Sequence, residues 1–233
     1  MRLGIMQPYF IPYLGYWQLM NAVDVYLVYD DVNFIKGGRI NRNNILINHE
    51  AKPVNLILSG ASPNKHINEV RVDRSPVSIR KLVAKIEGAY SRAPYFQDVF
   101  PLMENIFRQE EDDLGKYLFN SFRCIGSYLG MNTKLLLSSE LEKDNDLKGK
   151  EKVMDICKRL NADEYYNSVG GMHLYDKAEF AEHGITLHFL QMNDDVVYPQ
   201  FKEPFVPNLS IVDVMMFNSK ERCQELLKEF TLL

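Results

Sequence analysis

The chain has 233 residues, 46% hydrophobic and 25% charged, with a formal net charge of −4. This length allows one large domain or two small ones with a full core, and the composition is ordinary for a globular protein. The small negative charge excludes a general electrostatic attraction to nucleic acid or anionic membranes, so any anion site must be local.

The N-terminal third begins with a strand–helix–strand pattern. Leu3 to Met6 reads as a buried strand, Pro12 to Val23 as a helix, and Val25 to Tyr29 as a second buried strand. A connection of this length predicts a parallel pair joined by a right-handed crossover. Further short strands are predicted from their apolar and β-branched residues, over 34–40, 44–48, 54–58 and 67–72.

Helical periodicity dominates the middle of the chain, and alternation of the two element types returns in the last third. Helices are predicted over 79–90, from Pro94 onward, and over 114–129, where Gly130 suits a left-handed cap. Strands at 133–137, 164–166 and 185–190 then alternate with helices at 150–160, 175–182 and 221–230. The charged stretch 140–152 is predicted to be a solvated loop.

These elements predict an α/β fold with a mostly parallel sheet and a nucleotide-binding-like strand–helix–strand start. We expect residues 1–233 to form a single domain, with an inserted helical subdomain at about 76–130.

The first candidate site is the turn that follows the first strand. Its aromatic and glycine residues lie where a strand ends and a helix begins, a common place for ligands in α/β proteins. Glycine there would let a ligand approach the helix backbone closely. The alternative is a tyrosine-rich corner used only for packing. The residues of this candidate site are Gln7, Tyr9, Tyr13, Gly15 and Tyr16.

A second candidate site combines carboxylates with cations. Asp30 and Asp31 end the second strand, and Lys36, Arg39, Asn41 and Arg42 follow around Gly37-Gly38. Arginine beside glycine suits a phosphate, pyrophosphate or carboxylate. A solvated basic hairpin explains the cations equally, and one carboxylate could simply orient Lys36 or Arg39. The acidic pair is also a weak candidate for Mg²⁺, since two adjacent carboxylates are few ligands.

A third candidate is the loop around Asn167, Gly170 and Gly171, which follows a short strand. Its glycines suit a ribose or phosphate, although a plain turn between a strand and a helix explains them as well. His173 lies in this loop and is the candidate for acid–base chemistry, whereas the five histidines show no metal spacing. No metal site is therefore predicted.

The three cysteines, Cys124, Cys157 and Cys223, fall on apolar helical faces, which predicts small buried side chains. Their odd number, with no signal peptide and no membrane span apparent in the sequence, predicts a cytoplasmic protein.

Ordered blocks along nearly the whole chain resemble the WbqC-like family of bacterial proteins. These blocks are Gln7 to Tyr16, Tyr29 to Lys36, Arg39 to Asn43, Ala93 to Phe96, Gly170-Gly171 with Leu174-Tyr175, Tyr198-Pro199-Gln200, and Leu209 to Asp213. The start of the chain also resembles the nucleotidyltransferase and pantothenate synthetase superfamily, but tyrosines stand where its loop has histidines.

The family resemblance implies a role in making O-antigen and other surface polysaccharides. It points to a transferase that moves an acyl or aminoacyl group onto a nucleotide-linked amino sugar. Two alternatives stay open: an ATP-dependent nucleotidyltransferase or ligase that activates a small carboxylate, and a non-catalytic nucleotide-sugar-binding or scaffold protein. The sequence leaves the cofactor and a homo-oligomer open.

In the transferase hypothesis the three candidate segments have distinct roles. The tyrosines and Gly15 line the pocket, while Lys36, Arg39 and Arg42 hold the diphosphate or stabilise developing negative charge. Asp30 or Asp31 serves as base or orienter. Gln200, in a predicted closing loop, completes the set of substrate-binding residues.

Overall fold

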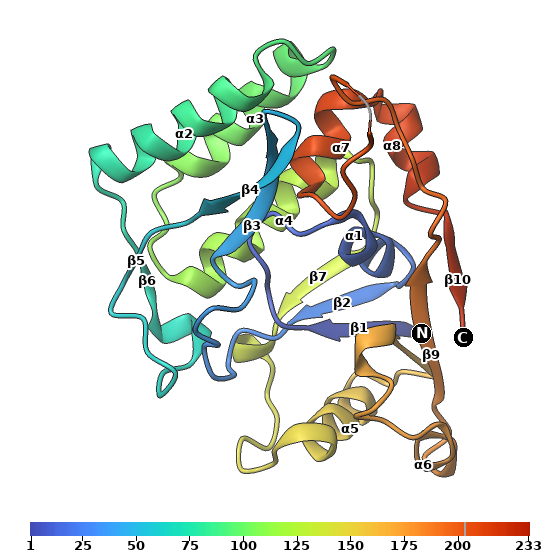
Figure 1. Cartoon of the computed structure of the whole chain (residues 1–233). Helices are drawn as coiled ribbons and strands as arrows, with labels where there is room; N and C mark the ends of the chain where they lie inside the picture. Colours follow the sequence, from blue (N-terminus) through green and yellow to red (C-terminus); the bar gives the residue numbers. More distant parts are fainter. Residues whose placement is uncertain (203) are drawn as a thin grey trace.

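A computed structural model describes residues 1–202 and 204–233 and confirms the α/β fold. Within this part of the chain, six strands form the central sheet in the order β10-β9-β8-β1-β2-β7 (Figure 1). All neighbouring pairs are parallel except β10–β9, which is antiparallel. The sheet strands are β1 (Arg2–Met6), β2 (Val25–Val28), β7 (Lys134–Leu137), β8 (Glu164–Ser168), β9 (Thr186–Met192) and β10 (Phe230–Leu232).

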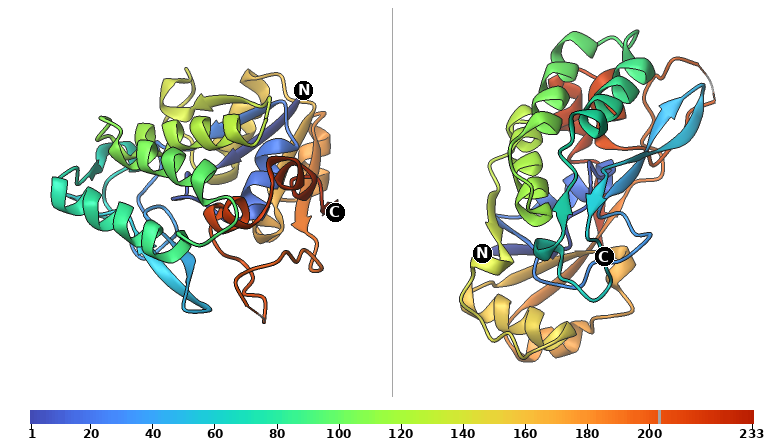
Figure 2. Two further views of the ribbon diagram at one scale, coloured as in Figure 1. Left: turned by 90° about the horizontal axis from the view of Figure 1, so that it is seen from above. Right: turned by 90° about the vertical axis from the view of Figure 1, so that its left-hand side faces the viewer.

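Helices cover both faces of this sheet, as Figures 1 and 2 show. The side chains of Leu3 and Ile5 in β1 and Leu27 in β2 pack into one core with α5 and α6. Tyr26 and Val28 of β2 point the other way, into a larger core with the remaining helices. The alternation arises because successive side chains of a strand point to opposite faces. The helices are α1 (Leu14–Asn21), α2 (Pro76–Tyr90), α3 (Phe96–Arg108), α4 (Leu114–Tyr128), α5 (Gly149–Arg159), α6 (Lys177–Glu182), α7 (Ile211–Phe217) and α8 (Lys220–Leu226).

Shorter elements fill the connections. The antiparallel hairpin of β3 (Arg42–Ile47) and β4 (Glu50–Asn55) turns through Asn48 and His49, both with positive φ, as a type I′ turn requires. A second pair joins β5 (Leu58–Ser59) to β6 (Arg71–Val72), and 3-10 turns occupy Ile67–Glu69, Ser138–Glu140 and Val169–Gly171.

Two predicted strands are wrong for local reasons. Residues 34–40 form turns instead, because Gly37 has a left-handed φ of 79° and the Arg42 guanidinium donates to the carbonyls of Gly37 and Gly38. Residues 67–72 start as a 3-10 turn, because the backbone N–H of His66 donates to the Glu69 carboxylate at 2.7 Å in a capping box. Only Arg71 and Val72 of that segment form a strand.

Several boundaries also differ. The first helix starts at Leu14 instead of Pro12, the strand predicted at 54–58 is divided between β4 and β5, and the last helix ends at Leu226. Strand β10 follows that helix because it pairs with β9, a long-range contact that a local pattern does not show.

Candidate functional site

The strand order places one ligand position at the carboxyl edge of the sheet. From β1 the chain moves to β2 and β7 on one side, and then returns to β8 on the other side. The order therefore reverses between β1 and β8, and ligands of open α/β sheets bind outside the carboxyl ends of the strands at such a point. The segments beside it are the turn after Met6 and the loop after Ser168.

The turn after β1 is held in one conformation by three later segments. Phe10 N–H donates to the Arg39 carbonyl at 3.0 Å, and the Asn43 amide donates to the carbonyls of Phe10 and Ile11. The Ser210 hydroxyl also donates to the Ile11 carbonyl, at 2.8 Å. Ile11 has a φ of 37°, a conformation that a β-branched residue adopts only when its surroundings impose it. The aromatic turn and the cationic segment thus lie side by side.

Gly15 and Tyr16 are both buried, so neither contributes to the exposed surface of the turn. A Cβ on Gly15 would lie 2.6 Å from the Tyr13 ring, so a glycine at this position leaves room for that ring. Tyr16 is 2% exposed and donates its hydroxyl to the Gln7 carbonyl at 2.8 Å. Its ring supports Tyr9, whose centroid lies 5.4 Å away, so Tyr9 is the half-buried aromatic ring of the turn at this edge.

Tyr13 faces a different place. It lines a cavity of about 360 Å³ with Tyr198, Phe205 and Asn208, beside the loop that precedes α7. Tyr13 and Ser210 also form an isolated β-bridge, which fixes the start of α1 against the start of α7.

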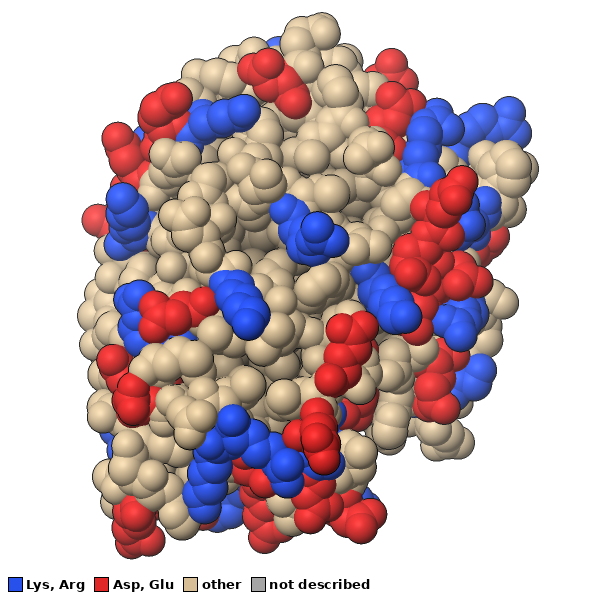
Figure 3. Space-filling view, turned by 180° about the vertical axis from the view of Figure 1, so that it is seen from behind, with Lys and Arg blue, Asp and Glu red and all other residues tan. Residues whose placement is uncertain are grey.

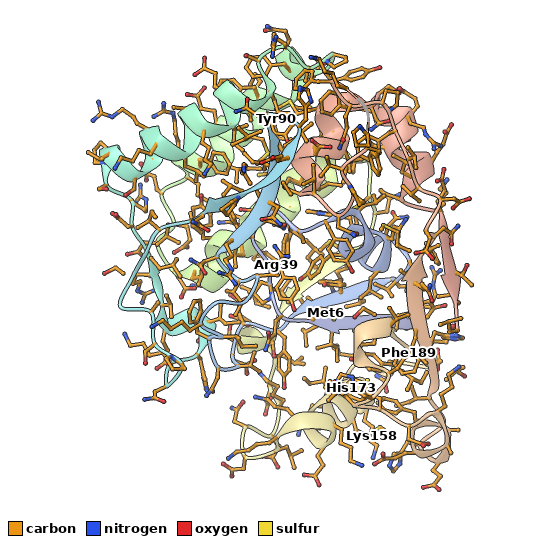
Figure 4. All side chains as sticks on the ribbon, viewed as in Figure 1. Met6, Arg39, Tyr90, Lys158, His173 and Phe189 are labelled. Carbon is orange, nitrogen blue, oxygen red and sulfur yellow. The ribbon has the colours of Figure 1, made fainter. Side chains whose placement is uncertain are left out.

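The predicted cations differ in their surroundings. Arg42 uses its guanidinium to hold the turn at Gly37-Gly38, whereas Lys36 and Arg39 are exposed, and their side chains have no hydrogen-bond or ion-pair partner within the described residues. Burial raises the pKa of Tyr9 above its usual value, and the nearby positive charge of Arg39 opposes this shift. In Figure 4, Arg39 lies above β1 and His173, which is also exposed, lies below it.

Three more of the predicted polar residues already have protein partners. The Asn41 amide donates to the Leu56 carbonyl at 3.0 Å. Asn167 donates to the Tyr165 hydroxyl at 3.0 Å and covers Gly171, while Gly170 is exposed. Gln200 donates to Asp213 and pairs with the Val206 backbone. Like Arg42, these residues position the loops around the candidate site.

The two carboxylates after β2 point to opposite sides and have different partners. Asp30 is 1% exposed and accepts hydrogen bonds from Ser139 at 2.9 Å (backbone N–H) and 2.6 Å (hydroxyl). Burial raises the pKa of Asp30 above its usual value, although the Ser139 hydrogen bonds oppose this shift. A Cβ on Gly115 would lie 2.9 Å from the Asp30 Cβ, so Asp30 packs against the first turn of α4.

Asp31 is paired with two lysines that the sequence analysis placed in a solvated loop. Its Oδ2 lies 2.8 Å from the Lys143 Nζ and 3.3 Å from the Lys152 Nζ. Burial opposes ionisation, but the hydrogen bond from Lys143 and the two positive charges hold the pKa of Asp31 below its usual value. The prediction of a wholly solvated stretch 140–152 is therefore wrong for Lys143 and Lys152, which fold back onto the sheet edge.

We expect the contact between Asp30 and α4 to reverse the usual effect of replacing glycine in a helix. Gly115→Ala should lower the free energy of unfolding by about 1–3 kcal/mol, because a new Cβ meets a short, fixed side chain. Gly88→Ala in α2 is the matched control, since nothing lies within 4 Å of its added Cβ, and it should stabilise by about 1 kcal/mol. Chemical denaturation measures both; equal effects would contradict the contact.

A large groove lies at the opposite edge of the sheet. It encloses about 1060 Å³ between α3, α4 and the start of β7, and its lining is uncharged apart from Arg123. Figure 3 shows this back face, whose centre is mostly uncharged and hollowed. The groove contains no residue of the three candidate segments.

Two further findings concern residues 1–202 and 204–233 together. Among the described residues, no group of three His, Cys, Asp or Glu side chains is placed to hold a metal ion. In the same residues, no helix combines the length and apolar character that crossing a membrane requires.

Helices on both faces and a reversal of strand order define this chain as a doubly wound α/β protein. The chain belongs to the WbqC-like protein family, whose sequence profile matches residues 7–225. It is 28% identical over 224 residues to "Uncharacterized protein Rv1507c" of Mycobacterium tuberculosis, with 93% of each chain covered. No solved structure matches this chain.

Proposed function

We propose that this protein is a transferase that moves an acyl or aminoacyl group onto a nucleotide-linked amino sugar used for surface polysaccharide such as O-antigen. The observation that carries the proposal is the reversal of strand order between β1 and β8, with Tyr9, Lys36 and Arg39 on segments beside the same sheet edge; neither cation's side chain has a partner among residues 1–202 and 204–233. The cations suit a diphosphate, and an aromatic ring suits a base or sugar.

In this proposal His173 takes the proton from the attacking amine. The amino nitrogen of the sugar forms a bond to the carbonyl carbon of the donor, and the bond from that carbon to the donor's leaving group breaks. The proton lost by the nitrogen passes to the imidazole and from there to the leaving group. Asp30 and Asp31 have their own partners at 2.6–3.3 Å, so they position the loops in this proposal and take no proton from the substrate.

The direct test is mass spectrometry of the protein incubated with nucleotide-linked amino sugars and acyl or aminoacyl donors, with and without ATP and Mg²⁺. A mass increase on the sugar without ATP supports the transferase. Pyrophosphate release that requires ATP and a small acid would favour the ligase alternative. Binding of an unchanged nucleotide sugar would favour the non-catalytic alternative.

Arg39→Ala and Lys36→Ala should each weaken nucleotide-sugar binding by about 10- to 100-fold. The estimate follows from about 1.5–3 kcal/mol for a hydrogen bond to a charged group. Titration calorimetry measures the affinity, and Arg80→Ala on the exposed side of α2 is the control with unchanged binding. If both site variants bind as tightly as the unmodified protein, these cations do not hold the diphosphate.

A further inference from the structure

Two buried ammonium groups share a single carboxylate at the carboxyl edge of the sheet. The side chains of Lys143 and Lys152 are 2% and 9% exposed, and both pair with the same oxygen of Asp31. Buried charges are costly unless each is paired and hydrogen-bonded. The local sum of two positive charges and one negative charge therefore leaves one positive charge uncompensated.

The neighbouring carboxylate forms no ion pair with either lysine within the described residues. Asp30 instead accepts from Ser139 and packs against the start of α4. The ring of Tyr29 also faces the cluster, and its centroid lies 5.6 Å from the Lys152 Nζ. An aromatic face attracts a cation without neutralising it.

The ammonium groups of the two lysines differ in how many hydrogen bonds they donate. Lys143 also donates to the carbonyls of Ser138 and Leu141, so it ties the connection after β7 to the sheet edge. Lys152 makes one hydrogen bond within the described residues, to Asp31, although an ammonium has three donors. The Ser138 hydroxyl lies near the Asp31 carboxylate but is buried without a hydrogen bond of normal geometry. Asp31 Oδ1 is also buried without a partner among the described residues, so it can accept from this hydroxyl, whereas the two unused donors of Lys152 remain available to a further acceptor.

We propose that Lys152 is an anion-binding residue that holds a phosphoryl or pyrophosphoryl group, with Asp31 and Lys143 as the positioning pair. Only the source of the anion rests on the proposed function: there the group belongs to the nucleotide sugar, and otherwise to a free nucleotide or pyrophosphate. A doubly charged phosphoryl oxygen cluster supplies both the missing negative charge and the missing acceptors.

The test is binding of inorganic pyrophosphate at low ionic strength, by titration calorimetry. Lys152→Met should weaken binding at least tenfold, and Lys152→Arg should restore it to within about threefold, since charge and donors return. Lys158→Met is the matched control, because Lys158 is exposed on the same helix, and it should bind like the unmodified protein (Figure 4). Unchanged binding by Lys152→Met, or equal losses in both Met variants, would overturn the proposal.

Hydrogen exchange of the unmodified protein keeps the proposal testable if Lys152→Met does not fold. Pyrophosphate should then protect the backbone of residues 138–152, and protection confined to residues 36–42 would overturn it. A nucleoside-diphosphate amino sugar as second ligand distinguishes the source of the anion. A loss of affinity for both ligands assigns the site to the substrate, and a loss for pyrophosphate alone assigns it to a free anion. These measurements test the anion site, and the formation of a transfer product tests the proposed function separately.

Discussion

Asp31→Asn is expected to lower the free energy of unfolding at pH 7 by about 3–5 kcal/mol, the cost of removing one partner from a buried ion pair. The effect is large because the variant leaves both Lys143 and Lys152 buried without a carboxylate. Chemical denaturation followed by circular dichroism measures it. Asp24→Asn is the matched control, because Asp24 pairs with Arg2 at the exposed surface and should cost less than about 1 kcal/mol.

The same carboxylate should contribute to acid denaturation. The pKa of Asp31 lies below its ordinary value of 3.8 in the folded protein, so folding favours its ionised form. The stability that it contributes is fully present above pH 3.8 and disappears as the pH falls through the lower, folded-state pKa. Asp31→Asn should therefore lose less stability than the unmodified protein on acidification below pH 3.8. If the two acid profiles are parallel, the lysines do not stabilise the ionised carboxylate.

Asp213→Asn is expected to change the pH dependence of stability in the opposite sense. Asp213 is fully buried and accepts hydrogen bonds from Tyr90 at 2.9 Å, Tyr198 at 2.8 Å and Gln200 at 2.7 Å, with no cation among these partners. Burial raises the pKa of Asp213 from 3.8 to about 6, although all three hydrogen bonds oppose the shift. Folding therefore favours the protonated form.

The sign of the effect follows from that raised pKa. The stability associated with the protonated carboxyl is fully present below pH 3.8 and is lost as the pH rises through about 6. The shift corresponds to about 3 kcal/mol. Asparagine has the same shape and no charge. The free energy of unfolding of the variant, relative to that of the unmodified protein, should therefore rise by up to that amount between pH 4 and pH 7. Denaturation curves at four pH values measure the difference, and a constant difference would show that Asp213 does not titrate in this range.

Asp213 also explains why distant family blocks occur together. Tyr198 and Gln200 come from one block and Asp213 from another, and Tyr90 joins them from the end of α2. The Tyr90 hydroxyl in turn accepts the Leu46 N–H at 3.0 Å, which connects the network to the hairpin of β3 and β4. The sequence identified the blocks, but their contact needs the folded chain, and so does the contact of Asp213 with Tyr90, which lies 123 residues away.

The sequence predicted the candidate site unevenly. Asp30 and Asp31 were found because polar residues follow a buried strand, and the two serines after β7 carried the same signal. Lys143 and Lys152 were assigned to solvent, since a run of charged residues has no periodicity that shows which two fold inward. Lysine is rarely buried, so local composition favoured the wrong answer. Adjacent parallel strands end at one sheet edge, and applying that rule to β2 and β7 would have linked Asp31 to the segment that follows Ser138-Ser139.

Local patterns by themselves determined the α/β class, the parallel pairing of β1 with β2, and the cap at Gly130, which has a φ of 72°. These features depend on apolar periodicity and on conformations that only some residues adopt, and both are properties of short segments. The tertiary structure alone decided the order of the strands, the strand β10, the conformation of the turn after β1, and the partners of each carboxylate. Those depend on contacts between residues far apart in the chain, where burial and charge pairing outweigh local preference.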